Sequence, residues 1–231
     1  MAWSADGKVE AIKTHSDWER RRANLPAITR FVAIAIDGPL VPAGTDERAK
    51  RQCESFFIRG LFQKRCKPGL SHFGSGFALR RAARDTAEQF RHLAVSAGGP
   101  HIISDHWIVE AFPNAFIGVM LSDEAFSIGV GAKRKKFDWL YGHALREQVF
   151  KRLMRHLQWD CDALLARLEA ECDHERRAAL ICLLTAGCAA VGQAIVVGDE
   201  AGGYFWLPPR QLWAQWALDA LPLGDVAVHS R

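Results

Sequence analysis

Residues 31–40 read FVAIAIDGPL, and they give the first indication of the fold. Residues 31–36 are all apolar, which is typical of a strand that helices cover on both faces. The apolar run ends at Asp37 and is broken by Gly38 and Pro39. In open α/β sheets, ligand sites gather outside the carboxyl ends of the central strands. A carboxylate at the end of a buried strand is therefore a candidate ligand-binding residue.

A second stretch, residues 106–112 with the sequence HWIVEAF, has the same pattern. It predicts another central strand, which carries Glu110 and stops at Pro113. Two carboxylates at neighbouring strand ends repel each other unless a cation lies between them. Mg²⁺ usually binds one or two carboxylates together with water and substrate phosphates, and two-metal sites position the attacking water in phosphodiester cleavage. Asp37 and Glu110 are therefore candidate metal ligands.

Each of these acids also has a purely structural interpretation. Asp37 precedes a Gly-Pro pair, so its side chain can hydrogen-bond the backbone of its own turn. Glu110 lies between apolar residues, where an unpaired carboxylate is costly. An arginine partner would satisfy Glu110 as well as a metal ion would. The sequence leaves both interpretations open.

Elsewhere along the chain, segments with the pattern of a strand alternate with segments that have the pattern of a helix. Residues 8–14 predict a half-exposed strand, and residues 198–209 predict a turn and a short strand. Helices are predicted over residues 16–25, 45–60, 76–96, 138–157, 160–170 and 173–197. This alternation predicts a single layered α/β domain over residues 1–231.

Composition narrows the class of protein. A net charge of +4 permits a polyanionic partner without requiring one. Residues 1–10 lack the basic and apolar regions of a signal peptide, and none of the six cysteines lies in a CxxC pair. We therefore expect a cytoplasmic protein with reduced thiols. Residues 178–198 carry no charge, but their Ala- and Gly-rich composition favours a helix buried against a sheet over a membrane span.

A basic run lies in a predicted connection and consists of Lys133, Arg134, Lys135 and Lys136. Such a run can follow a phosphate backbone, so nucleic acid is a candidate partner. A solvated loop is the more common reason for adjacent basic residues. The sequence alone does not decide between these two explanations.

The C-terminal segment, residues 204–231, is rich in tryptophan. Trp206, Trp213 and Trp216 contribute to an apolar stripe with helical spacing. We expect such a stripe to pack in the core or to form a homodimer contact rather than to stack on nucleic-acid bases.

Five motifs, taken in order, resemble domain-of-unknown-function family 429. They are AIDGPL at 35–40, ERAKRQCE at 47–54, IVEAFP at 108–113, HERRAALICLLTA at 174–186 and VGDEAGGYFWLP at 197–208. Proteins of that family are regarded as nucleases with an RNase H-like fold. The resemblance therefore implies a mixed central sheet flanked by helices, with a mostly helical insertion at about residues 45–100. It also implies phosphodiester hydrolysis that depends on Mg²⁺ or Mn²⁺.

The resemblance places metal-binding and catalytic acids at Asp37, in the Ile-Asp-x-Pro-Leu motif, and at Glu110, in the Glu-x-x-Pro motif. Ala178 stands where the family has an aspartate on a helix. Glu175, one turn earlier on the same helical face, or Asp173 would then supply the third acid.

The sequence also departs from the family at its start. The family has an acid on a first strand, and residues 2–4, AWS, resemble the residues that usually follow it. We therefore expect that Met1 is an internal start and that the first central strand is missing or replaced.

Three functional hypotheses follow from these observations. The first is a metal-dependent nuclease. The second is a catalytically inactive RNase H-like relative that binds nucleic acid or a protein, which the two departures from the family favour. The third is an interaction protein that dimerises through Trp213 and Trp216.

Overall fold

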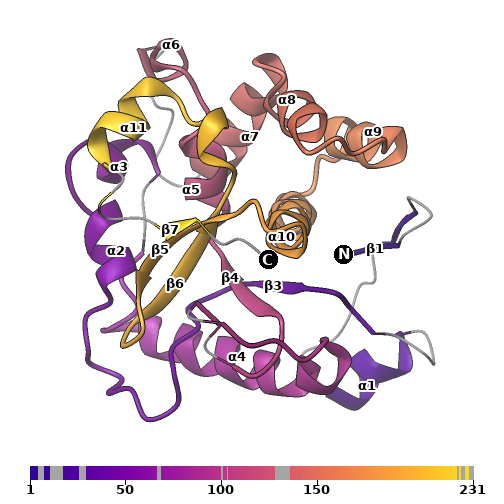
Figure 1. The fold of residues 1–231 in the computed structure, drawn as a ribbon, viewed down its shortest axis with the longest axis vertical. Helices are drawn as coiled ribbons and strands as arrows, with labels where there is room; N and C mark the ends of the chain where they lie inside the picture. The colour runs from indigo at the N-terminus through magenta and orange to yellow at the C-terminus, as the bar shows by residue number, and fades with distance from the viewer. Residues whose placement is uncertain are drawn as a thin grey trace.

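A five-stranded mixed sheet lies at the centre of the molecule, with strand order β3-β4-β6-β5-β7 (Figure 1). In this computed structural model, the described residues are 1–4, 8–10, 18–25, 30–66, 69–99, 101–102, 104–127, 136–222, 224 and 227–228. The sheet strands are β3 (Ile34–Asp37), β4 (Ile108–Ala111), β5 (Ile195–Asp199), β6 (Gly203–Leu207) and β7 (Ala227–Val228). β3, β4 and β6 run parallel, whereas β5 is antiparallel to both of its neighbours. The predicted α/β class, with a mixed sheet flanked by helices, is confirmed.

Helices cover both faces of this sheet. The first part of the chain supplies α1 (Trp18–Ala23), α2 (Gln52–Phe57), α3 (Gly60–Arg65), α4 (Ser75–Phe90) and the 3₁₀ turn η1 (Arg91–Leu93). The middle supplies α5 (Pro113–Gly118), α6 (Asp123–Ser127), α7 (Lys136–Arg146), α8 (Val149–His156) and α9 (Asp162–Ala170). The last part supplies α10 (His174–Ala190), η3 (Arg210–Leu212) and α11 (Gln215–Ala220).

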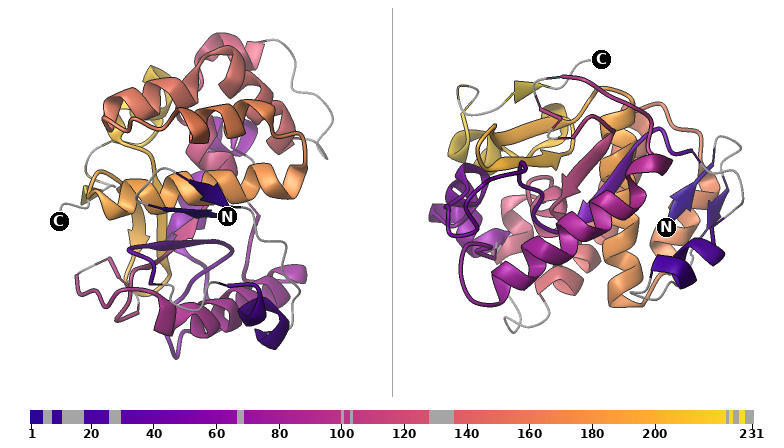
Figure 2. Two further views of the ribbon diagram at one scale, coloured as in Figure 1. Left: turned by 90° about the vertical axis from the view of Figure 1, so that its right-hand side faces the viewer. Right: turned by 90° about the horizontal axis from the view of Figure 1, so that it is seen from below.

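α4 and α10 lie on opposite sides of the sheet, with α7, α8 and α9 beyond α10 (Figures 1 and 2). Ala83 of α4 packs on the isoleucines of β3 and β4 in a small apolar cluster. This contact explains Gly38, because a Cβ atom at that position would lie 2.9 Å from the Cβ atom of Ala83. α10 buries Leu180, Ile181 and Leu184 in the main core.

β3 lies at the edge of the sheet and not at its centre. Among the described residues, β4 is the only strand that pairs with it. Its apolar run is nevertheless explained, because α4 packs on one face of β3 and α10 on the other. The N-terminal residues form a separate antiparallel pair, β1 (Ala2–Trp3) and β2 (Val9–Glu10). Trp3 in β1 packs edge-to-face on Trp159, with ring centroids 4.8 Å apart.

Four predicted helices differ from the structure. The helix predicted over 76–96 ends at Phe90, where the 3₁₀ turn η1 follows and Ala94 then pairs with Phe31. The helix predicted over 173–197 ends at Ala190, and the β-branched residues after Gly192 (φ 69°) begin β5. The helix predicted over 138–157 is divided into α7 and α8 by Gln148, which has a left-handed backbone conformation. Residues 45–51 of the helix predicted over 45–60 form a loop instead. Arg80 donates hydrogen bonds to the backbone carbonyl groups of Glu47 and Ala49 in this loop.

α10 contains most of the uncharged stretch at 178–198 and is packed against the sheet, as predicted. Within the described part of the chain, no helix is long and apolar enough to cross a membrane.

Candidate functional site

Glu110 in β4 is buried, and its partner is Arg51. Both carboxylate oxygens accept from the guanidinium group, with Nη1 to Oε1 at 2.9 Å and Nη2 to Oε2 as the second contact. Oε2 also accepts from the backbone N–H of Leu40, at 2.7 Å. This is a bidentate arginine–carboxylate pair, the strongest common form of charge-assisted hydrogen bond. Burial raises the pKa of Glu110 to about 7, and the charge of Arg51 opposes that rise.

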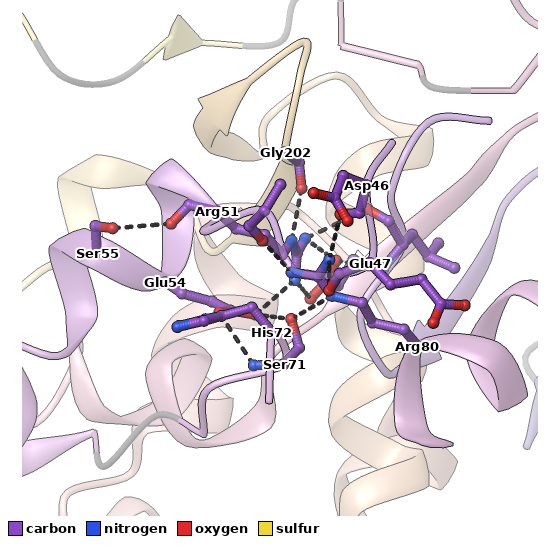
Figure 3. Close-up of polar contacts among 12 residues, drawn as sticks. Asp46, Glu47, Arg51, Glu54, Ser55, Ser71, His72, Arg80 and Gly202 are labelled. Atoms are coloured by element: carbon purple, nitrogen blue, oxygen red, sulfur yellow. Dashed lines mark hydrogen bonds and ion pairs between the residues drawn. The ribbon is translucent and has the colours of Figure 1, made fainter. Parts of the chain in front are cut away.

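Arg51 is 1% exposed and reaches further groups of the fold (Figure 3). Its Nε atom donates to the carbonyl of Gly202 at 2.6 Å. The adjacent Gly203 has φ +78°, and a Cβ atom there would lie 2.1 Å from the carbonyl oxygen of Leu40. Gly202, in the turn after β5, and Gly203, the first residue of β6, therefore let the backbone approach Arg51 and Leu40 closely.

A second buried ion cluster adjoins the first (Figure 3). Glu54, whose Oε1 atom lies 3.3 Å from Nη1 of Arg51, accepts from the backbone N–H of Ser71 at 3.1 Å and from its hydroxyl group. The Ser71 hydroxyl accepts in turn from Nε of Arg80 at 2.9 Å. Arg80 also donates to the carbonyl groups of Glu47 and Ala49. Two buried arginines thus balance two buried glutamates, and we name Arg51, Arg80, Glu54 and Glu110 the buried quartet.

Asp37 and Glu110 do not share a site. In the parallel pair of β3 and β4, Ile36 lies opposite Glu110 and Asp37 lies opposite Ala111. Residues directly opposite each other project from the same face, and successive residues project from alternate faces. Asp37 therefore lies on one face of the sheet and Glu110 on the other. The arginine alternative for Glu110 is the one that the structure supports.

Asp37 instead lies near Glu175, in the first turn of α10. Its side chain is open to solvent at the carboxyl end of β3. The surrounding protein nevertheless displaces enough water to raise the pKa of Asp37 to about 6, and the negative charge of Glu175 adds to the rise while His174 opposes it. The Glu175 side chain is also exposed. We name Asp37 and Glu175 the acid pair.

Asp173 has a different role, because it is the N-cap of α10. Its Oδ1 atom accepts from the backbone N–H of Arg176 at 2.9 Å, which satisfies one of the free donors of the first turn. His174 is hydrogen-bonded to Asp138 at 3.0 Å. Among the described residues, no group of three or more His, Cys, Asp or Glu side chains is arranged to hold a metal ion.

The basic run is only partly described. Lys133, Arg134 and Lys135 lie outside the described residues. Lys136 is 5% exposed at the start of α7, and its Nζ atom donates to the carbonyl of Lys64. Lys136 is therefore directed into the protein and not toward a phosphate backbone.

The three C-terminal tryptophans lie in the core of the chain itself. Trp206 is 1% exposed, Trp213 5% and Trp216 4%. The indole of Trp213 donates to the carbonyl of Pro208, and that of Trp216 to the carbonyl of Leu121. Core packing therefore explains the stripe, and the structure gives no support to a dimer contact through these rings.

Sequence reasoning missed Arg51 and Arg80. Arg51 lies in the segment predicted as a helix over residues 45–60 and Arg80 in that over residues 76–96, and nothing in the local pattern separates them from the other arginines there. The nearest signal was indirect, because a glutamate flanked by apolar residues requires a cation somewhere in the fold.

Comparisons with known proteins give no relative for this chain. No family model, no curated protein and no solved structure matches it.

Proposed function

We propose that this protein is a divalent-metal-dependent phosphodiesterase of RNase H-like type, in which the acid pair holds the metal ion. The observation that supports this proposal is that Asp37 ends a parallel strand on which α10 packs, and that Glu175 in the first turn of α10 lies close enough for its charge to act on Asp37. Among the described residues, no ion pair neutralises either carboxylate. Like charges held close together are costly, and a cation between them would relieve that cost.

The chemistry of the two ligands fits Mg²⁺ or Mn²⁺. These ions need only one or two carboxylates when water and substrate phosphates complete the coordination. When bound, such an ion activates water and stabilises the charge that develops on the phosphate. The role of this chain would be to hold the two carboxylates open to solvent on the side of the sheet that α10 covers.

Glu110 has no place in this proposal, because Arg51 and the Leu40 N–H group occupy both of its oxygens. The assignment of catalytic residues therefore narrows to Asp37 and Glu175.

The test is cleavage of labelled single-stranded, duplex and hybrid nucleic acids with Mn²⁺. We expect Asp37→Asn and Glu175→Gln to abolish cleavage. Asp173→Asn is the matched control, because it makes the same chemical change close to Glu175 while asparagine keeps the N-cap. Equal cleavage by all four proteins would refute the assignment of the acid pair.

A second candidate function is nucleic-acid binding without cleavage. The acid pair has only two carboxylates, and α8 exposes Lys151, Arg152 and Arg155 on one side without a carboxylate partner among the described residues. This function predicts binding in EDTA that weakens steeply with salt, and no cleavage with Mn²⁺.

We also propose a cytoplasmic location. All six cysteines are free, and five of them are buried, which fits a reducing compartment.

A further inference from the structure

A cavity of about 380 Å³ lies beside the buried quartet. Its inner wall is formed by Arg51 and Glu54, and Ile58 and Leu70 add apolar surface. Lys50 and Arg59 line it from the exposed side. The volume falls within the range that small-molecule sites occupy.

The charge around this cavity is unbalanced. The buried quartet contains two arginines and two glutamates, so its formal charges cancel. Among the residues that the structure describes, no ion pair joins Lys50 or Arg59 to a carboxylate. The two cations therefore give the cavity two uncompensated positive charges.

Arg59 is held in place at the cavity. Its Nε atom donates to the carbonyl of Ser55 at 2.7 Å, and its guanidinium carbon lies 5.9 Å from the ring centre of Phe56. An arginine oriented through Nε still has its terminal nitrogens to offer to an anion.

His72 adds an unsatisfied polar atom to the cavity wall (Figure 3). Its Nδ1 atom is buried and lies 3.7 Å from Oε2 of Glu54, which is beyond hydrogen-bond distance. No other group among the described residues bonds this atom. A buried polar atom without a partner is costly and calls for an explanation, such as a ligand or a water molecule.

We propose that this cavity binds a phosphate monoester through its phosphate group and through an apolar part of its substituent. A phosphate monoester carries about −1.5 to −2 charges at neutral pH, which matches the two cations at the cavity. Ile58 and Leu70 offer an apolar surface to the substituent. The site belongs to the Glu110 side of the sheet, so it is independent of the acid pair and of the proposed function.

The first experiment is calorimetric titration with phenyl phosphate, with phenol as the uncharged control. We expect phenyl phosphate to bind and phenol not to bind. Replacing both cations, with Lys50→Gln and Arg59→Gln, should weaken binding about a hundredfold, because each charge-assisted contact contributes about tenfold. Both side chains are exposed, so the variant should remain folded.

The matched control removes two other exposed cations, with Lys64→Gln on α3 and Arg22→Gln on α1. It has the same net charge as the first double variant and should bind phenyl phosphate like the original protein. Equal weakening in both double variants, or no binding by the original protein, would overturn the proposal.

The same phosphate group can come from a free metabolite or from the 5′ end of a nucleic-acid strand. Oligonucleotides with a 5′-phosphate and a 5′-hydroxyl distinguish these two sources. If the protein prefers the phosphorylated strand and this preference depends on Lys50 and Arg59, the natural ligand is a strand end. If the protein binds phenyl phosphate but shows no such preference, the natural ligand is a small molecule. Phenyl phosphate binding is measured in EDTA, where the acid pair holds no metal ion, so failure here is distinguishable from failure of Mn²⁺-dependent cleavage.

Discussion

At the scale of single residues, the same residue type has opposite roles at the ends of two neighbouring strands. Glu110 is buried and paired with Arg51, whereas Asp37 is open to solvent and lies beside a second carboxylate. The first arrangement is typical of a structural ion pair. The second costs stability when both carboxylates are ionised, and we propose that it binds a cation.

Glu110→Gln should destabilise the protein by about 3–5 kcal/mol, because it leaves the buried charge of Arg51 without a counter-charge. Urea unfolding followed by circular dichroism measures this loss. The matched control is Glu47→Gln, which breaks the bidentate pair with Arg81 at the surface. The control should leave the unfolding midpoint almost unchanged. Similar midpoints for the two variants would show that the Arg51 pair contributes little.

Asp37→Asn should stabilise the metal-free protein at pH 7 and have almost no effect at about pH 3. The pKa of Asp37 is raised from 3.8 to about 6 on folding, so the folded state disfavours the ionised form. This cost is negligible well below the unfolded pKa, appears as the pH rises through the two pKa values, and is complete above about pH 6. With allowance for solvent screening, we expect a gain of about 1 kcal/mol.

Thermal unfolding in EDTA at both pH values measures this effect. A loss of stability at pH 7 would show that a cationic group already pairs with Asp37 in the absence of metal.

At the scale of helices and strands, the sequence predicted the central elements well. β3 lies within the apolar run at 31–37 and β4 within the stretch at 106–112, and the helices α4 and α10 begin within one residue of their predicted starts but end earlier than predicted. Their termini carried clear signals, such as the Gly-Pro pair after Asp37 and proline after β4. β5 was missed because a short apolar run after a long helix has no periodicity of its own.

The sequence could not predict that Asp37 and Glu110 project from opposite faces of the sheet. Each strand end could be identified, but the register between the strands could not, and a shift of one residue reverses the faces. The two carboxylates were therefore expected together, while the register of Ile36 with Glu110 separates them.

The turn between β5 and β6 should tolerate no side chain at its second glycine. Gly203→Ala should destabilise the protein by at least about 2 kcal/mol, because φ there is +78° and the new Cβ atom would meet the Leu40 carbonyl. Gly69→Ala is the control, since nothing lies within 4 Å of a Cβ atom at that position. Thermal melting of both variants tests this, and an unchanged melting temperature for Gly203→Ala would contradict the close approach.

At the scale of the whole molecule, residues 204–221 of the C-terminal segment contribute to the core. Trp216 packs at 5.3 Å on Phe62 of α3 and lies under the guanidinium group of Arg65 at 4.5 Å. The segment therefore packs α11 against α3.

Trp216→Ala should destabilise the protein by about 3–5 kcal/mol without changing its state of association. Light scattering coupled to gel filtration, together with urea unfolding, measures both quantities. A change from dimer to monomer with unchanged stability would support the dimer contact instead.

The buried quartet also has a consequence for the order in which the molecule assembles. Arg51 is separated by 59 residues from Glu110 and by 151 from Gly202, and Leu40 by 70 from Glu110. Contacts so distant along the chain close large loops, which makes folding slow. Until those loops close, Arg51 remains hydrated, so we expect its contacts to be absent from the transition state. The buried quartet would then mainly lower the rate of unfolding. Loss of Glu110 would raise that rate and shorten the lifetime of the native state.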